Sequence, residues 1–295
     1  MNKWWTYQKE RCPVFENLTV SAVICFSTLF FAGFFEKIKF SFLPFLGVIM
    51  IAFCFFILIR IADEHKDYEE DCIENPERPV QRGLITLKEL FKAGVFITVI
   101  QVILVLLINV KSMVFLGIVW GWFFLMIKEF FVRKWLVKHQ IIYTILHIAL
   151  IVPMNLFILS VFYENKTLGI FLNPNVIVFI LLELSCLGII SITRELELPD
   201  KHKNNPQKVS LMRRLSAGAV LVTFLSALLS GYILKILNAP IYFYFIFLAA
   251  AIVLITVSII SHKKQTDKNF KIVQAASAFW ALTSMMGSAL VTFIK

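Results

Sequence analysis

The chain has 295 residues, of which 59% are hydrophobic and 16% are charged, and its formal net charge is +10. Soluble domains are about 45–50% apolar and about 25% charged, so the composition excludes a water-soluble globular protein and indicates a lipid environment. The positive charge lies between apolar runs, which predicts contact with anionic membrane lipid and no nucleic-acid partner. The five cysteines have no CxxC or zinc-finger spacing, so we expect no disulfide framework.

Nine apolar stretches are long enough to cross about 30 Å of hydrocarbon as helices. They cover residues 18–35, 42–62, 90–109, 112–131, 140–162, 174–193, 213–235, 240–261 and 272–294. Continuous runs of Phe, Leu and Ile without period-two alternation favour helices over a β-barrel. We therefore expect an all-α, multi-pass membrane bundle of about nine transmembrane helices, formed as a single domain over residues 1–295.

The basic residues of the connections are distributed unevenly between the two sides of the membrane. With the amino terminus inside, 22 of the 29 lysines and arginines fall in inside segments and six in outside segments. This positive-inside bias predicts a cell-membrane protein (inner or plasma membrane) with a cytoplasmic amino terminus. The two longest polar connections, residues 63–89 and 194–212, then lie in the cytoplasm, where we expect the active site.

The second span ends in an acidic cluster, RIADEHKDYEED, at positions 60–71. Asp63, Asp67 and Asp71 recur every four residues, which places them on one face of a helix, and Glu64 flanks them. Like charges in register repel and require a counter-charge, and carboxylates with substrate phosphates are ligands that suit Mg²⁺. The pattern therefore predicts a Mg²⁺–diphosphate site at the membrane surface, with a solvated acidic helix end as the alternative.

A polar loop, NPERPVQRGL, follows at residues 75–84. Arg78 and Arg82 are suited to bidentate contacts with phosphate oxygens. An acidic metal platform beside two arginines, within a strongly apolar bundle, indicates a substrate with a diphosphate head and a hydrocarbon tail. Isoprenyl diphosphates have this chemistry.

These two stretches resemble the signatures of the UbiA superfamily of intramembrane prenyltransferases, N-D-x-x-D-x-x-x-D and N-x-x-R-P-x-x-x-G. DEHKDYEED matches the first signature, with Asp63 at the Asn position and Glu64 at the next acid, and NPERPVQRG matches the second. The nine-span layout also matches the family. The resemblance implies Mg²⁺-dependent transfer of a prenyl group from an isoprenyl diphosphate to an aromatic, quinone-precursor or other lipophilic acceptor. It implies that the metal is bound by Asp63, Glu64, Asp67 and Asp71. It also implies that the diphosphate is contacted by Lys66, Arg78 and Arg82.

One further stretch is a weaker match to the family. KEFFVRKWL, residues 128–136, looks like the exit of the fourth span, where Lys128 is either a phosphate contact or an ordinary interfacial anchor.

The second acidic motif of the family is altered in this chain. SITRELELPDKH, residues 191–202, stands in its place, with Ser191 at the first acid and Asp200 at a later one. The resemblance implies that Glu195, Glu197 and Asp200 supply metal carboxylates in a shifted register and that Arg194 contacts the diphosphate. A weakly held second metal and a charged interfacial loop are the alternatives.

Several polar residues lie within the spans. An unpaired carboxylate in hydrocarbon is costly, so Glu183 is expected to face a cavity or a partner, and it lies eight residues before Ser191 on a similar helical face. Tyr143 and His147 share a face of the fifth span, with Asn155 two turns beyond. These residues either line the substrate cavity or make hydrogen bonds between helices.

Two other functions fit part of the pattern. The altered second motif is compatible with a membrane-bound class I terpene cyclase, in which the donor's own double bond captures the cation. Intramembrane acids such as Glu183 suit a non-catalytic transporter or lipid-binding scaffold, but a transporter site is expected near the midplane at broken helices.

Overall fold

A computed structural model describes most of the chain as helix. It covers residues 2–38, 40–136, 138–163, 166–194, 196 and 206–294, with the backbone alone at residues 140, 206–216 and 293. Within these ranges there is no strand, and nine helices are long and apolar enough to cross a membrane. These are Val14–Gly33, Phe42–Lys66, Leu87–Ile108, Val110–Ile127, Ile141–Tyr163, Pro174–Arg194, Ala217–Ile236, Ile241–Lys263 and Asp267–Thr292. The prediction of an all-α, multi-pass membrane protein is confirmed.

The chain forms two compact units, which are described separately. The first unit contains Met1–Cys25, Ile38–Leu136 and Pro153–Thr167. The second contains Phe26–Lys37, Val137–Val152 and Leu168–Lys295. The expectation of a single domain over residues 1–295 stays a prediction.

The first unit holds the amino-terminal helices, the acidic cluster at residues 60–71 and the polar loop at residues 75–84. Its elements are α1 (Lys3–Arg11), the first part of α2 (Val14–Gly33), α3 (Phe42–Lys66), α4 (Tyr68–Glu74), α5 (Leu87–Ile108), η1 (Val110–Ser112), α6 (Met113–Ile127), η2 (Glu129–Phe131), α7 (Arg133–Leu136) and most of α9 (Ile151–Tyr163).

A buried amide ties three helices of the first unit together. α3 packs along both α5 and α6. Gln101 of α5 is fully buried, donates to the carbonyl of Ile51 on α3 at 3.1 Å, and accepts from the indole of Trp120 on α6 at 3.1 Å. Because a buried amide must be hydrogen-bonded, these contacts fix the helices that lead to the candidate site.

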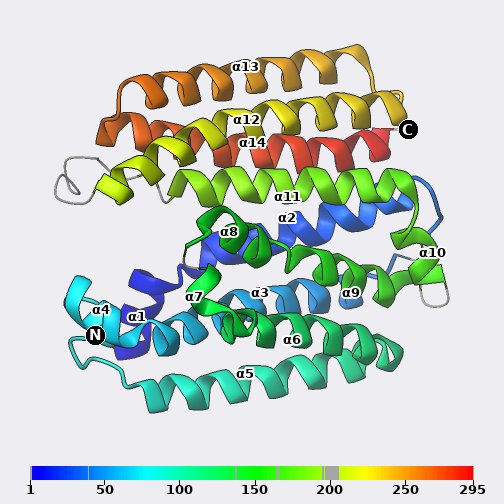
Figure 1. Cartoon of the computed structure of the whole chain (residues 1–295). Helices are drawn as coiled ribbons and strands as arrows, with labels where there is room; N and C mark the ends of the chain where they lie inside the picture. The colour runs from blue at the N-terminus through cyan, green and yellow to red at the C-terminus, as the bar shows by residue number, and fades with distance from the viewer. Residues whose placement is uncertain are drawn as a thin grey trace. The chain divides into compact units, whose positions relative to one another are not determined.

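The second unit is built around four long helices. Its elements are the rest of α2, α8 (Gln140–Ile148), most of α10 (Thr167–Phe171), α11 (Pro174–Arg194), α12 (Pro206–Ile236), α13 (Ile241–Lys263) and α14 (Asp267–Ile294). α11 packs on α12, α12 on α13, α13 on α14, and α14 on α11, so the four run side by side as Figure 1 shows. Asn238 adopts a left-handed conformation (φ 45°) in the turn that ends α12, a role in which Asn is tolerated.

The fifth span is broken, although the sequence predicted it as one helix. α8 ends at Ile148 and α9 begins at Ile151. Pro153 explains the break, because its ring removes the backbone N–H and clashes with the carbonyl of the residue four positions earlier, which is Ala149.

Large apolar side chains cover the outer surface of the first unit. On α5, Phe91, Phe96 and Leu107 are between 62% and 78% exposed. A surface this apolar is stable only against lipid, which agrees with the membrane assignment of α5.

Candidate functional site

The three aspartates of the acidic cluster lie where α3 gives way to α4. Asp67 stands between Lys66, the last residue of α3, and Tyr68, the first of α4, with φ −101° and ψ 12°. The backbone N–H of Asp67 donates to the carbonyl of Asp63 at 2.9 Å, and that of Asp71 donates to Asp67 at 2.8 Å. The four-residue spacing of a helix is therefore kept through the junction.

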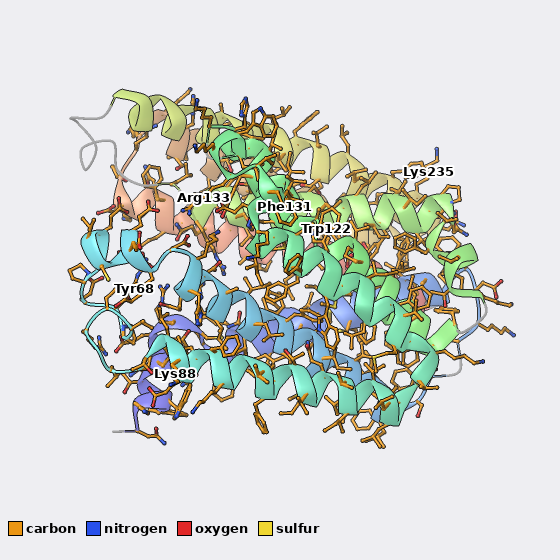
Figure 2. The ribbon with its side chains drawn as sticks, turned by 60° about the horizontal axis from the view of Figure 1, so that its bottom comes forward. Tyr68, Lys88, Trp122, Phe131, Arg133 and Lys235 are labelled. Atoms are coloured by element: carbon orange, nitrogen blue, oxygen red, sulfur yellow. The ribbon has the colours of Figure 1, made fainter. Side chains whose placement is uncertain are left out.

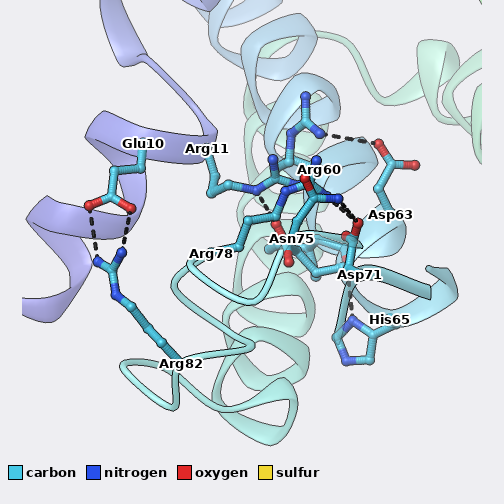
Figure 3. A network of polar contacts seen from close by, with 11 residues as sticks. Glu10, Arg11, Arg60, Asp63, His65, Asp71, Asn75, Arg78 and Arg82 are labelled. Carbon is cyan, nitrogen blue, oxygen red and sulfur yellow. Dashed lines mark hydrogen bonds and ion pairs between the residues drawn. The ribbon is translucent and has the colours of Figure 1, made fainter. Parts of the chain in front are cut away.

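The carboxylates of Asp63 and Asp67 have only distant cationic partners. Asp63 lies 3.7 Å from Arg60, and Asp67 lies 3.9 Å from Lys66 (Figure 3 shows the first pair). Both separations are longer than a charge-assisted hydrogen bond, which measures about 2.7–2.9 Å. Of the three aspartates, Asp63 and Asp67 are thus the two that the protein does not hold tightly.

Asp71, in contrast, is used within the protein. Its buried side chain accepts a hydrogen bond from the amide of Asn75 at 2.9 Å and pairs with Arg78, both from the loop after α4 (Figure 3). A buried carboxylate with these donors is satisfied without a metal ion. Asp71 therefore fastens the loop to α4 through Asn75 and Arg78.

Glu64 is also engaged by a protein cation. Its side chain is fully buried, and its Oε1 accepts a hydrogen bond from Nε of Arg11 at 2.5 Å. Arg11 belongs to α1, so the partner comes from a helix that the sequence reading left without a role. A guanidinium thus lies where the resemblance places a metal.

Arg82 has a partner on α1 as well. Its guanidinium makes two hydrogen bonds to the carboxylate of Glu10, at 3.0 and 3.1 Å, and donates to the carbonyl of Glu77 at 2.7 Å (Figure 3). The next residue, Gly83, has φ 76°, a conformation that favours glycine, and it turns the chain toward α5. The loop is therefore held by its own turn and by α1.

A second charged cluster lies where α6 ends. Glu129, Phe130 and Phe131 have φ of 47°, 52° and 60°, so the chain makes a left-handed turn that non-glycine residues rarely adopt. Glu129 is buried, and its carboxylate lies 3.3 Å from Lys66 and 3.2 Å from Arg133. Phe131 and Arg133 are seen beside the end of α6 in Figure 2. The turn thus brings an acid to the last residue of α3.

Sequence reasoning missed Glu129 and named its neighbour Lys128. Lys128 is exposed and, within the residues that the structure describes, forms no ion pair. The available signal was the i,i+4 spacing of Glu129 and Arg133 at the exit of an apolar span. The contact between Glu129 and Lys66 could not be predicted from the sequence. The left-handed turn at residues 129–131 that produces it contains no glycine, the residue that would have indicated such a turn.

Negative charge accumulates around Asp67. Burial raises the pKa of its carboxyl, and the ammonium of Lys66 opposes this shift. Three neighbouring carboxylates raise the pKa further, those of Asp71, Glu70 and Glu129. A cation bound at Asp67 would favour the charged form, so the position is suited to receive one.

The donor set was tested against Mg²⁺, the ion that the resemblance implies. No group of three or more His, Cys, Asp or Glu side chains converges on one point in the described part of the chain, so a cage made of protein ligands alone is absent there. Mg²⁺ is often held by only one or two carboxylates, with water and substrate phosphates in the other positions. Asp63 and Asp67 fit this second mode, whereas Glu64 and Asp71 are committed to arginines.

The predicted second motif is described only in part. Ser191 and Arg194 form the carboxyl-terminal end of α11 in the second unit, with Ser191 partly exposed and Arg194 exposed. Glu195, Glu197 and Asp200 lie outside the described residues. Their role as metal ligands stays a prediction.

Glu183 has hydroxyl partners in the second unit. It is fully buried in α11, and its Oε1 accepts hydrogen bonds from Ser27 and Thr28 of α2, each at 3.2 Å. The ring of Phe31 stacks on that of Phe179 one turn away, with centroids 4.3 Å apart. Of the two roles that the sequence left open, these contacts favour a hydrogen bond between helices.

The remaining predicted cavity residues separate into two groups. On α8 the rings of Tyr143 and His147 stack with centroids 4.0 Å apart, and Nδ1 of His147 lies 2.9 Å from the carbonyl of Tyr143. Asn155 is fully buried on α9, beyond the break in the fifth span, and belongs to the first unit. Tyr143 and His147 therefore lie together in the second unit, whereas Asn155 belongs to the first.

Neither a protein-family model nor a curated protein matches the sequence. Two solved structures match its fold. A structure of digeranylgeranylglyceryl phosphate synthase in membranes is 19% identical, with a TM-score of 0.65 over 100% of both chains. The apo structure of a UbiA homolog from Aeropyrum pernix K1 is 10% identical, with a TM-score of 0.65 over 93% of this chain and 98% of that chain. This chain has the UbiA fold.

The likeness deduced from the two sequence motifs is thus confirmed in the fold. Both motifs lie in the first unit of this UbiA fold, at the end of α3 and in the loop before α5. Asp63 and Asp67 are its two loosely paired carboxylates, and Lys66 lies between Asp67 and Glu129.

Proposed function

We propose that this protein is a UbiA-type prenyltransferase that transfers a prenyl group from an isoprenyl diphosphate to an aromatic, quinone-precursor or other lipophilic acceptor within the membrane. The observation that carries the proposal is the pair of loosely held carboxylates, Asp63 and Asp67, at the end of a membrane-spanning helix in a chain with the UbiA fold. A site for a charged head thus adjoins a region for an apolar tail.

Asp63 and Asp67 are the residues that would hold Mg²⁺. When bound, Mg²⁺ supplies Lewis-acid polarisation of the diphosphate oxygens. The cations of the chain add to this charge, because Arg60 lies 3.7 Å from its carboxylate partner Asp63 and Lys128 is exposed, so both can turn toward a diphosphate. Their part is to attract the diphosphate and to stabilise the negative charge that grows on it as it leaves.

The chemistry breaks one bond and forms one. The allylic C–O bond of the donor breaks and its electron pair leaves with pyrophosphate; the nucleophile of the acceptor then bonds to the allylic carbon and loses a proton. The apolar helices exclude water, which would otherwise capture the allylic cation. The digeranylgeranylglyceryl phosphate synthase that shares this fold supports the inclusion of a glyceryl-phosphate lipid among the acceptors to be tested.

The test is pyrophosphate release by the full-length protein in lipid nanodiscs with Mg²⁺. Geranyl, farnesyl and geranylgeranyl diphosphate serve as donors, each with and without 4-hydroxybenzoate or geranylgeranylglyceryl phosphate. Acceptor-dependent release that is lost in Asp67→Asn supports the proposal. Glu69→Gln is the matched control, since Glu69 is an exposed acid on the same short helix. Release without acceptor, giving a cyclic hydrocarbon, would instead identify a terpene cyclase, and no release with any donor would favour a transporter or scaffold.

We also propose that α4 and the candidate site face the cytoplasm, as the positive-inside bias indicates. The chain offers a natural reporter, because Cys72 on α4 is exposed while the other four cysteines are buried. A membrane-impermeant maleimide should label Cys72 only after permeabilisation of the cells, and Cys72→Ser should abolish the signal. Labelling of intact cells would reverse the orientation.

A further inference from the structure

The amino-terminal helix α1 contacts three segments in or beside the candidate site. It is a nine-residue helix that begins after Asn2, whose side chain accepts the backbone N–H of Trp4. Its charged residues form three ion pairs with the end of α3, the loop after α4 and the start of α5: Arg11 with Glu64, Glu10 with Arg82, and Lys3 with Glu89. All of these segments belong to the first unit.

An apolar anchor reinforces these ion pairs. Tyr7 of α1 is buried and packs in a cluster with Ile61 of α3, Val80 and Ile85 of the loop, and Leu90 of α5. The same three segments that receive the charged contacts therefore receive the ring of Tyr7. The ring of Tyr7 therefore packs α1 against all three segments, while its hydroxyl is buried without a hydrogen-bond partner among the described residues.

The pair between Arg11 and Glu64 bears directly on the metal. Glu64 is fully buried and Arg11 nearly so, with 14% of its side chain exposed. A buried carboxylate without a cation is strongly unfavourable, and here the cation is a guanidinium fixed on a neighbouring helix. Oε2 of Glu64 is buried and has no hydrogen-bond partner among the described residues, so the contact of Oε1 with Arg11 is what neutralises this carboxylate.

We propose that α1 positions the candidate site: Arg11 neutralises Glu64 and Glu10 holds Arg82, so Glu64 and Arg82 shape the site and touch neither metal nor diphosphate. This inference rests on the proposed function and refines it. Arg11 and Glu10 are positioning residues, which act through the segments that carry Asp63 and Asp67.

The test uses charge variants of the buried pair in the full-length protein. Arg11→Gln leaves Glu64 buried without a cation, and it should lower the melting temperature by several degrees and speed hydrogen–deuterium exchange in residues 3–11. It should also weaken binding of Mn²⁺ with inorganic pyrophosphate, followed by electron paramagnetic resonance, by about 10- to 100-fold, the usual effect of removing a supporting residue.

The double variant and a surface control make the result specific. Glu64→Gln combined with Arg11→Gln removes both charges and should restore exchange and Mn²⁺ affinity to within about threefold of the wild type. Glu64→Gln alone leaves Arg11 without its anionic partner, so it should also lower the melting temperature, but it should keep the Mn²⁺ affinity within about threefold of the wild type because it removes no metal ligand. Lys3→Gln, which breaks an ion pair of the same helix that is more exposed than the pair between Arg11 and Glu64, should change little.

A single result overturns the inference. If Glu64→Gln alone weakens Mn²⁺ binding by about tenfold or more while exchange in α1 is unchanged, Glu64 is a metal ligand. The same holds if the double variant binds Mn²⁺ no better than Arg11→Gln. The exchange and resonance measurements need no turnover, so absence of pyrophosphate release in the wild type refutes the proposed function separately.

Discussion

Lys66 lies 3.3 Å from the carboxylate of Glu129 and 3.9 Å from that of Asp67. Its ammonium is thus shared between a carboxylate on the exit of α6 and one at the junction of α3 and α4. Because Glu129 is nearer and only 6% of its side chain is exposed, it draws Lys66 away from Asp67. Glu129 is therefore one of several charged groups that act on Asp67, beside Lys66, Asp71 and Glu70.

Loss of the Glu129 carboxylate should destabilise the first unit. In Glu129→Gln, the ammonium of Lys66, 12% exposed, loses the carboxylate that lies 3.3 Å away. We expect the free energy of unfolding to fall by about 3 kcal/mol, measured by denaturant titration in detergent. Arg133→Gln is the control, since Arg133 is 59% exposed, and it should cost at most about 1 kcal/mol. Equal losses in the two variants would refute the assignment.

Asp67 and Asp71 should respond differently to the same isosteric change. Asp67→Asn removes a loosely paired carboxylate, so turnover should fall by at least about tenfold with little change in stability. Asp71→Asn removes the charge that Arg78 pairs with, so unfolding should become easier by about 2 kcal/mol. Pyrophosphate release and thermal unfolding, measured on both variants, separate the two roles. A stability loss confined to Asp67→Asn would contradict them.

The sequence revealed the spans and one face of the site because both depend on local patterns. Apolar runs are visible without tertiary structure, and the spacing of Asp63 and Asp67 is carried by backbone bonds four residues apart. The partners of Glu64 and Arg82 were not predictable, because Arg11 and Glu10 come from a distant segment and many acids were equally eligible.

The stability of the protein without metal should depend on pH through Asp67. Burial raises the pKa of Asp67 above the ordinary aspartate value of about 3.9, so the folded state keeps this proton where the unfolded state releases it. The stabilisation from Asp67 is complete below the unfolded pKa and is lost as the pH rises through the folded pKa. Thermal unfolding followed between about pH 3.5 and 7 should show a smaller loss for Asp67→Asn than for the wild type.

The same raised pKa should appear in activity. The charged form of Asp67 is the one that attracts a cation, so the acid limb of pyrophosphate release should lie above about pH 4. Glu70 is one of the groups that raise this pKa, so Glu70→Gln should move the limb to lower pH. Glu69→Gln, which alters an exposed acid that is not among these groups, should leave it in place. A limb that shifts equally in both variants would reflect general surface charge.

Gly83 should tolerate a side chain poorly for conformational reasons alone. Its φ is 76°, and no atom lies within 4 Å of the position that a Cβ would take, so Gly83→Ala meets no steric clash with neighbours. The left-handed conformation should still cost about 1–2 kcal/mol of unfolding free energy, and Gly83→Asn should cost less. Gly117→Ala, on α6, also meets no atom within 4 Å and lacks a positive φ, so it should be neutral or slightly stabilising. Equal effects at the two glycines would mean that backbone conformation is not the cause.

Substitutions of Glu183, in the second unit, can distinguish a structural role of this side chain from a catalytic one. Its Oε1 accepts from the hydroxyls of Ser27 and Thr28, and an amide oxygen serves as an acceptor equally well. Glu183→Gln should therefore unfold nearly like the wild type and retain pyrophosphate release, whereas Glu183→Leu removes the acceptor of both bonds and should cost about 1–3 kcal/mol. Leu181→Ala, at a 47% exposed position of the same helix, controls for general loosening of α11. Loss of turnover in a Glu183→Gln protein that melts normally would place this carboxylate in the reaction, since only its charge would have changed.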